Sequence, residues 1–184
     1  MSETVAKTIH AAELTTAASG EWHPVILAFL CNWCSYAGAD LAGVSRFQIK
    51  PHFRVVRTLC SARVDPEFIL HAFKKGADGV MVLGCHPGDC HYIGGNFRTR
   101  RRVALLKIML KQFGLHADRF RLEWVSASEG EKFAKVVNEF VGRVTALGAS
   151  PFRTQAEEKK KKADAAVAAA AQPAIAGAAP AAHR

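Results

Sequence analysis

Apolar residues gather in four short runs along the chain, separated by longer stretches of mixed character. VILAFL spans residues 25–30 and GVMVLGC spans residues 79–85. Continuous apolar runs of this length are typical of strands buried on both faces in a parallel sheet. FRVVRTLC, residues 53–60, gives another strand of this kind, and FRLEWVS, residues 120–126, gives a fourth. We therefore expect a sheet of about four strands.

The segments between these runs carry helical spacing. Asp65 and Pro66 supply an N-cap and a first helical position, and the pattern ends at Gly76, a residue type that commonly terminates helices. Apolar side chains recur every three or four residues over 99–113 and again over 133–147. This alternation of strand and helix predicts an α/β fold: a single Rossmann-like or flavodoxin-like parallel sheet with helices on both faces. If the strand order is 2-1-3-4, the first and third strands flank the point where the winding direction switches.

The two ends of the chain differ in character from its middle. Residues 1–22 show no sustained period and are predicted to form a flexible leader. Residues 151–184 combine a KKKK run with alanine and proline, and we expect a low-complexity tail without an apolar stripe that could dock. The folded α/β domain is therefore placed at residues 23–150.

Length and composition fit one domain in a reducing compartment. The chain has 184 residues, of which 49% are hydrophobic, and no apolar run approaches the roughly 20 residues needed to cross a bilayer. The N-terminus lacks a secretory signal, so the cytoplasm is the expected location. Five cysteines in that compartment favour a metal or redox site over disulfides.

All five cysteines are predicted to converge on one edge of the sheet. Cys31 ends the first strand and Cys34 follows it, Cys60 ends the second, Cys85 ends the third, and Cys90 lies in the next loop. Carboxyl ends of parallel strands share one edge, and open α/β sheets bind ligands there, where the winding direction switches. The sequence therefore predicts a cysteine-rich ligand site at this edge.

Several chemistries use clustered thiols. An iron–sulfur cluster takes four cysteine ligands, which loops from several strands can supply, and this is the interpretation we favour. Structural zinc takes similar ligands, but it usually stabilises a very small fold, whereas this chain is long enough to form its own core. A Cys-x-x-Cys dithiol is a further alternative, which three additional cysteines at the same edge disfavour. The last alternative is that the cysteines are buried only as small hydrophobic residues.

The formal net charge of +9 leaves +6 for the body once the +3 of residues 153–184 is set aside, and much of it lies in Arg98, Arg100, Arg101 and Arg102. Such a patch suits nucleic acid, an acidic partner or an anionic cofactor. Positive charge is unfavourable at a helix start, so an anionic cluster or partner nearby would offset the cost. We therefore predict that these arginines guide partner docking, the alternative being a solvated basic face.

Other chemistries find less support. His86 and His91 flank Cys90 closely enough to be considered as ligands, but five available thiols make them neighbours of the site instead. No strand is followed by G-x-G-x-x-G, and no serine lies in a nucleophile-elbow context. We expect no catalytic residues and no independent substrate chemistry.

The cysteine-containing strings resemble a known family. CNWCSYAGAD, VRTLCSARVDPEFILHAFKKGADGVMVLGC and HPGDCHYIGGNFRTRRR are similar to the delta subunit of methyl-viologen-reducing [NiFe] hydrogenase, over a region from about Val25 to Leu147. The leader and the long Ala/Lys tail are departures from that family.

The resemblance implies a [2Fe–2S] cluster held by four of the five cysteines Cys31, Cys34, Cys60, Cys85 and Cys90. Cys85 and Cys90 are favoured as ligands because their glycine-rich loop can wrap a cluster. The resemblance also implies an electron-transfer component of an oxidoreductase complex in flavin-based electron bifurcation or confurcation. Its partners would be a heterodisulfide reductase A-like flavoprotein and a hydrogenase, formate dehydrogenase or other donor module. The alternative function is a thiol or iron–sulfur redox sensor that binds nucleic acid through the arginine patch.

Overall fold

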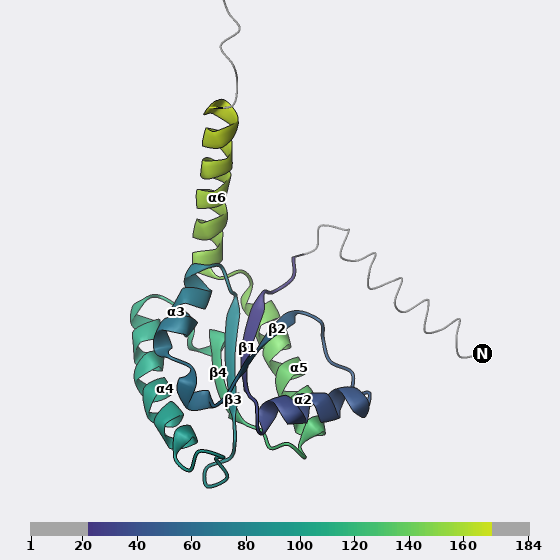
Figure 1. Cartoon of the computed structure of the whole chain (residues 1–184). Coiled ribbons are helices and arrows are strands. Elements are labelled where there is room, and N and C mark those ends of the chain that lie inside the picture. The colour runs from purple at the N-terminus through teal and green to yellow at the C-terminus, as the bar shows by residue number, and fades with distance from the viewer. Residues whose placement is uncertain (1–21, 171–184) are drawn as a thin grey trace, which may run out of the picture.

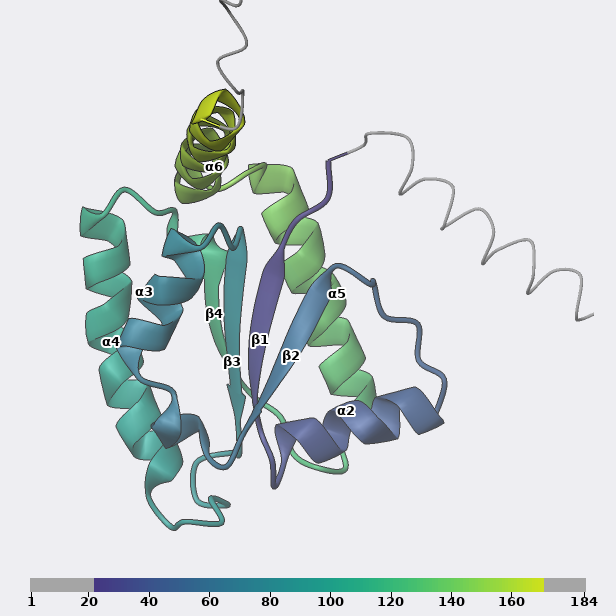
Figure 2. The same ribbon diagram turned by 45° about the horizontal axis from the view of Figure 1, so that its top comes forward.

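The computed structural model describes residues 22–170 and contains one parallel four-stranded sheet. The strands are β1 (Ile26–Cys31), β2 (Phe53–Thr58), β3 (Gly79–Gly84) and β4 (Phe120–Trp124). Their spatial order is β2-β1-β3-β4, which Figure 2 shows across the sheet. The predicted fold class is confirmed, and the observed order places β1 and β3 side by side at the centre of the sheet. The leader, except for Trp22, and residues 171–184 of the tail lie outside the described part of the chain.

Helices cover both faces of the sheet (Figure 1). One face carries α2 (Ser35–Val44) and α5 (Gly130–Leu147), and the other carries α3 (Pro66–Lys74) and α4 (Gly95–Gln112). Two short 3-10 turns, η1 (Ser61–Arg63) and η2 (Ala117–Arg119), precede α3 and β4. The predicted cap of α3 is present, since the Asp65 carboxylate accepts the Glu67 N–H at 3.0 Å.

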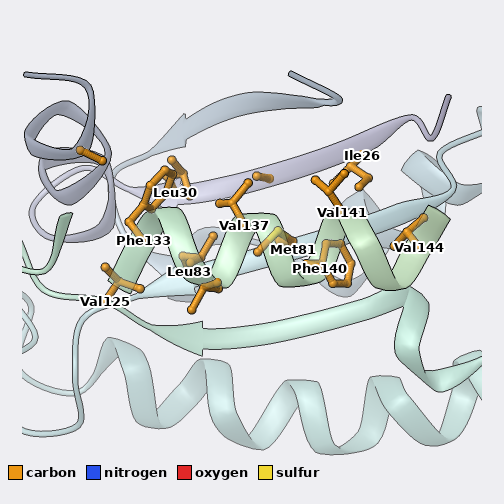
Figure 3. Packing of buried hydrophobic residues seen from close by; sticks show 13 residues of the cluster. Ile26, Leu30, Met81, Leu83, Val125, Phe133, Val137, Phe140, Val141 and Val144 are labelled. Carbon is orange, nitrogen blue, oxygen red and sulfur yellow. The ribbon is translucent and has the colours of Figure 1, made fainter. Parts of the chain in front are cut away.

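Alternating side chains of the central strands build two separate cores. Ile26, Leu30 and Met81 point toward α5, where Phe133 and Phe140 meet them (Figure 3). Side chains of opposite parity pack with α3 and α4 in the second core. Strands that are buried on both faces must be apolar at every position, which explains the uninterrupted runs in β1 and β3.

The expectation of full burial is wrong for β2. Four of its six residues are exposed, among them Val55 and Val56 at 41% and 38%, because β2 pairs only with β1 and forms an edge of the sheet. Arg54 and Arg57 interrupt its apolar pattern, and exposed charge is typical of edge strands.

Helix α2 has no counterpart among the predicted helices. Its sequence, SYAGADLAGV, contains mostly small residues and no broad apolar stripe. Gly38 explains the composition, because a Cβ at this position would lie 2.7 Å from the Ser126 carbonyl oxygen. Small residues therefore let α2 approach the chain that leads into α5.

The segment expected to be an undocked tail begins as a docked helix, α6 (Pro151–Ala170). Phe152 packs against the second core, and Arg153 forms an ion pair with the fully buried carboxylate of Asp78 at 2.5 Å. Asp78 also accepts the N–H of Ser150 at 2.7 Å and of Val25 at 2.8 Å. The first turn of α6 thus belongs to the domain, and the remainder projects from it (Figure 1).

None of the helices within residues 22–170 combines the length and the apolar character that crossing a membrane requires.

Candidate metal centre

Three thiols meet where β1 and β3 end. Cys31 is the last residue of β1, Cys34 directly precedes α2, and Cys85 directly follows β3. Their sulfur atoms all lie within 4.8 Å of one another, and the Cys31 and Cys85 sulfurs are 3.7 Å apart. All three side chains are buried and none forms a disulfide. This is the one group of three or more histidine, cysteine or acidic residues within 22–170 whose ligand atoms lie so close.

Buried hydrogen bonds fix the backbone that carries these thiols. The Ser35 hydroxyl accepts the Cys31 N–H and donates to the Leu83 carbonyl, both at 2.8 Å, and so links β1 to β3. The Asn96 side chain, also buried, donates to the carbonyl oxygens of Cys85 and His86. The three thiols are therefore held by contacts from α2 and α4 as well as by the sheet.

Cys60 and Cys90 lie together at the start of α4. A Cβ added at Gly95 would overlap the Cys60 sulfur and lie 3.0 Å from the Cys90 sulfur. Glycine at this position thus lets both sulfurs approach the helix backbone. The predicted convergence of five thiols is present as three tightly grouped and two beside them.

The thiols shift one another's pKa. A hydrogen bond from the Cys34 thiol lowers the pKa of Cys31 to about 5, aided by N–H groups of Trp33 and Ser61 and by the Cys85 thiol. The same interaction raises the pKa of Cys34, and burial raises that of Cys85 to about 11. Without a cation, one negative charge is therefore stable in this group, whereas a bound metal would favour full deprotonation.

The pKa values of Cys60 and Cys90, the two thiols at the start of α4, are also shifted in opposite directions. Burial raises the pKa of Cys60. Burial also acts to raise the pKa of Cys90, but N–H groups of Tyr92, Asn96 and Gly95 outweigh it and lower the pKa overall. The start of α4 therefore stabilises a thiolate, as helix N-termini do.

The four predicted arginines separate into two kinds. Arg98 and Arg102 line a pocket of about 460 Å³ that also contains Cys60, and Arg102 donates to the Ala62 carbonyl at 2.7 Å. Arg100 and Arg101 are exposed on α4 and do not line this pocket. Arg63 does line it and was missed by sequence reasoning, although its position three residues after Cys60 was a usable signal.

The two histidines are outside the group of three thiols. His86 Nε2 lies 2.6 Å from the Glu129 carboxylate, which also accepts the Ser126 N–H at 2.7 Å. The His91 ring stacks on Trp33 with centroids 3.8 Å apart. Each thus has a partner other than the clustered sulfurs.

Comparison with known proteins identifies the family. The family described as "Methyl-viologen-reducing hydrogenase, delta subunit" matches residues 26–148. The chain belongs to this family. All five cysteines lie inside the matched region, whereas α6 lies beyond it.

Relatives of this family show two chain organisations. The iron-sulfur D subunit of the F420-non-reducing hydrogenase vhc of Methanococcus voltae is 53% identical over 127 residues, which are 69% of this chain and 88% of the relative. The iron-sulfur D subunit of the F420-non-reducing hydrogenase of Archaeoglobus profundus is 51% identical over 135 residues, 73% of this chain and 97% of the relative. The A subunit of the Ferredoxin/F(420)H(2)-dependent CoB-CoM heterodisulfide reductase of Methanosarcina acetivorans is 54% identical over 125 residues, 68% of this chain but 16% of the relative.

Proposed function

We propose that this chain is an iron–sulfur electron-transfer subunit with no substrate chemistry of its own. The observation that carries the proposal is the group of three buried thiols within 4.8 Å, with two further thiols at the adjacent helix start. Names of family relatives as hydrogenase iron-sulfur subunits support it. Free, buried cysteines fit a reducing compartment, and we place the protein in the cytoplasm.

The thiols fit a [2Fe–2S] cluster, which takes four cysteine ligands. Cys31, Cys34 and Cys85 would supply three, and Cys60 or Cys90 the fourth. When bound, the cluster would take up and release single electrons. Around it, burial of the thiols excludes water, and N–H groups directed at Cys31 and Cys90 stabilise their negative charge.

The proposed partners are a hydrogenase or other dehydrogenase module and a heterodisulfide reductase A-like flavoprotein, in electron bifurcation or confurcation. The Methanosarcina relatives, which are named as A subunits of heterodisulfide reductases, contain the matched sequence within one longer chain. Because the two parts are joined in those relatives, we infer that this chain associates with a separate heterodisulfide reductase A-like protein. Arg98, Arg100, Arg101 and Arg102 supply positive charge for such docking.

Elemental analysis tests the cluster directly. The protein, purified and kept without oxygen, should contain about two irons and two acid-labile sulfides per chain, and reduction should produce an EPR signal. Zinc without labile sulfide would refute the proposal.

Single Cys→Ser variants test the ligand set. Substitution of Cys31, Cys34 or Cys85 should abolish or strongly alter the cluster spectrum, because their sulfurs form the tight group. Of Cys60 and Cys90, one substitution should do the same and the other should leave the spectrum intact. Unfolding of each metal-free variant serves as the control for general damage. Five unchanged spectra would show that the cluster site is wrongly assigned.

A further inference from the structure

Large apolar side chains are exposed around the cysteines. Trp33 is 46% exposed, Leu59 63%, Tyr92 48%, Ile93 88% and Phe97 46%. Trp33 lies between Cys31 and Cys34, Leu59 precedes Cys60, and the other three follow Cys90. The apolar surface therefore lies on the segments that carry the thiols, and Phe97 extends it into the first turn of α4.

Part of this surface is an ordered ridge. The ring of Trp33 stacks on His91, and Tyr92 meets the same imidazole edge-on with centroids 5.0 Å apart. Trp33 Nε1 also donates to the Tyr92 hydroxyl at 3.2 Å. A ridge already held in one arrangement loses little conformational entropy when a partner covers it.

Ile93 extends from the end of this ridge with an unfavourable backbone conformation. Its φ is +63°, a region that β-branched residues avoid, and its N–H donates to the Cys90 carbonyl at 2.8 Å. The side chain is 88% exposed, so packing within the described fold offsets little of this cost. Strained residues of this kind concentrate at functional contacts.

A basic pocket lies beside the ridge. Arg63, Arg98 and Arg102 line it together with Tyr92 and Cys60, and its volume is about 460 Å³. No aspartate or glutamate lines this pocket, and within residues 22–170 no ion pair involves its three arginines. The pocket thus offers guanidinium groups to a carboxylate from outside the described chain.

We propose that the ridge and the basic pocket form a two-part docking surface for the heterodisulfide reductase A-like flavoprotein. An acidic segment of the flavoprotein enters the basic pocket, and an apolar depression on it receives Ile93. The inference rests on the proposed electron-transfer function and specifies its docking site. A protein fits the surface better than a nucleic acid does, because an aliphatic side chain next to an aromatic ridge offers nothing to a phosphate backbone. Docking here brings the partner against Cys60, next to the proposed cluster.

The pocket is tested by comparing Arg63→Ser with Arg54→Ser, which removes the same charge from exposed β2. Affinity for the heterodisulfide reductase A-like flavoprotein of the same organism is measured by biolayer interferometry with cluster-loaded protein. Arg63→Ser should weaken binding about tenfold at low salt and by less at high salt, whereas Arg54→Ser should change it less than twofold. If the two variants weakened binding equally, the pocket would not be the docking site and only unspecific charge attraction would remain.

Ile93 is tested against Ile108, an isoleucine of α4 that is 58% exposed. Ile93→Asn should weaken binding about tenfold while its melting temperature stays equal or rises, since asparagine tolerates positive φ. Ile108→Asn should leave the affinity unchanged. Wild-type affinity retained in Ile93→Asn would overturn the apolar contact.

Two further outcomes separate this inference from the function on which it rests. If the wild-type chain contains iron and sulfide but does not bind the flavoprotein, the docking surface is wrong and the cluster assignment stands. If iron is absent, the proposed function itself fails. Salt-dependent binding of a labelled DNA duplex that is lost in Arg63→Ser would identify the surface as a nucleic-acid site and overturn the proposal.

Discussion

Replacing Gly95 with alanine should separate metal binding from folding. Gly95 is the first residue of α4, and an added methyl group would overlap the Cys60 sulfur and lie 3.0 Å from that of Cys90. Ordinary contact begins near 3.4 Å, so the Cys90 sulfur must move by at least about 0.4 Å. Metal–ligand distances tolerate about 0.2 Å, which makes this displacement large for a cluster ligand.

The effect of Gly95→Ala on folding should be small by comparison. Inserting a methyl group into a packed site costs about 1–3 kcal/mol, and the low end applies because the sulfurs can rotate aside. Removing glycine from a helix returns about 0.5–1 kcal/mol. The net change is therefore within about 2 kcal/mol, or roughly 6 °C in melting temperature for a chain of this size.

Gly94→Ala is the matched control, because a Cβ at Gly94 would meet no atom within 4 Å. After anaerobic reconstitution, Gly95→Ala should hold less than about half the iron and labile sulfide of Gly94→Ala. The two metal-free proteins should melt within roughly 6 °C of each other. Equal iron content and identical visible spectra would refute the reasoning, since they would show that neither Cys60 nor Cys90 binds the cluster where the structure holds them.

Two further predictions concern stability. Asp78→Asn should lower the free energy of unfolding, measured by urea denaturation, by about 3 kcal/mol, because it leaves the Arg153 guanidinium without its buried partner. The control is Glu157→Gln at an exposed ion pair, which should change this free energy by less than about 1 kcal/mol. Hydrogen bonds from the Ser126 N–H and from His86 lower the pKa of Glu129 from 4.5 to about 2. The carboxylate therefore stabilises the fold above about pH 4.5, and that contribution disappears as the pH falls toward 2. Between pH 6 and pH 3, the urea midpoint should therefore fall less in Glu129→Gln than in wild type. An equal fall in both proteins would show that Glu129 does not contribute in this way.

Much of the fold could be predicted because central strands must be apolar at every position. β1 and β3 satisfy this rule, and their neighbours followed from the alternation with helices. β2 was placed correctly but its burial was not, because Val55 and Val56 look the same in an edge strand as in a central one. Helix α2 escaped prediction because Gly38 and its small neighbours pack by close approach, which leaves no apolar stripe in the sequence.

The site was predictable only at the level of strand ends. The positions of Cys31, Cys60 and Cys85 after successive strands were sufficient to predict one cysteine-rich edge. The division into three thiols and two depends on how closely α4 approaches, and that distance is set by Gly95 in three dimensions. Spacing along the chain could not distinguish Arg98 from Arg100 either, because it did not show which α4 arginines face the pocket.

The chain enters and leaves the α/β fold near the end of the sheet where the strands begin (Figure 1). The thiols lie at the other end, where β1 and β3 finish. Asp78 lies between these two passages, since it binds Val25 just before β1 and Arg153 just after the family match ends, and Arg153 also donates to the His23 carbonyl. Neighbouring ends make a domain easy to embed in another polypeptide. The fold is therefore suited to additions before or after it, such as α6 here, at the end of the sheet away from the thiols.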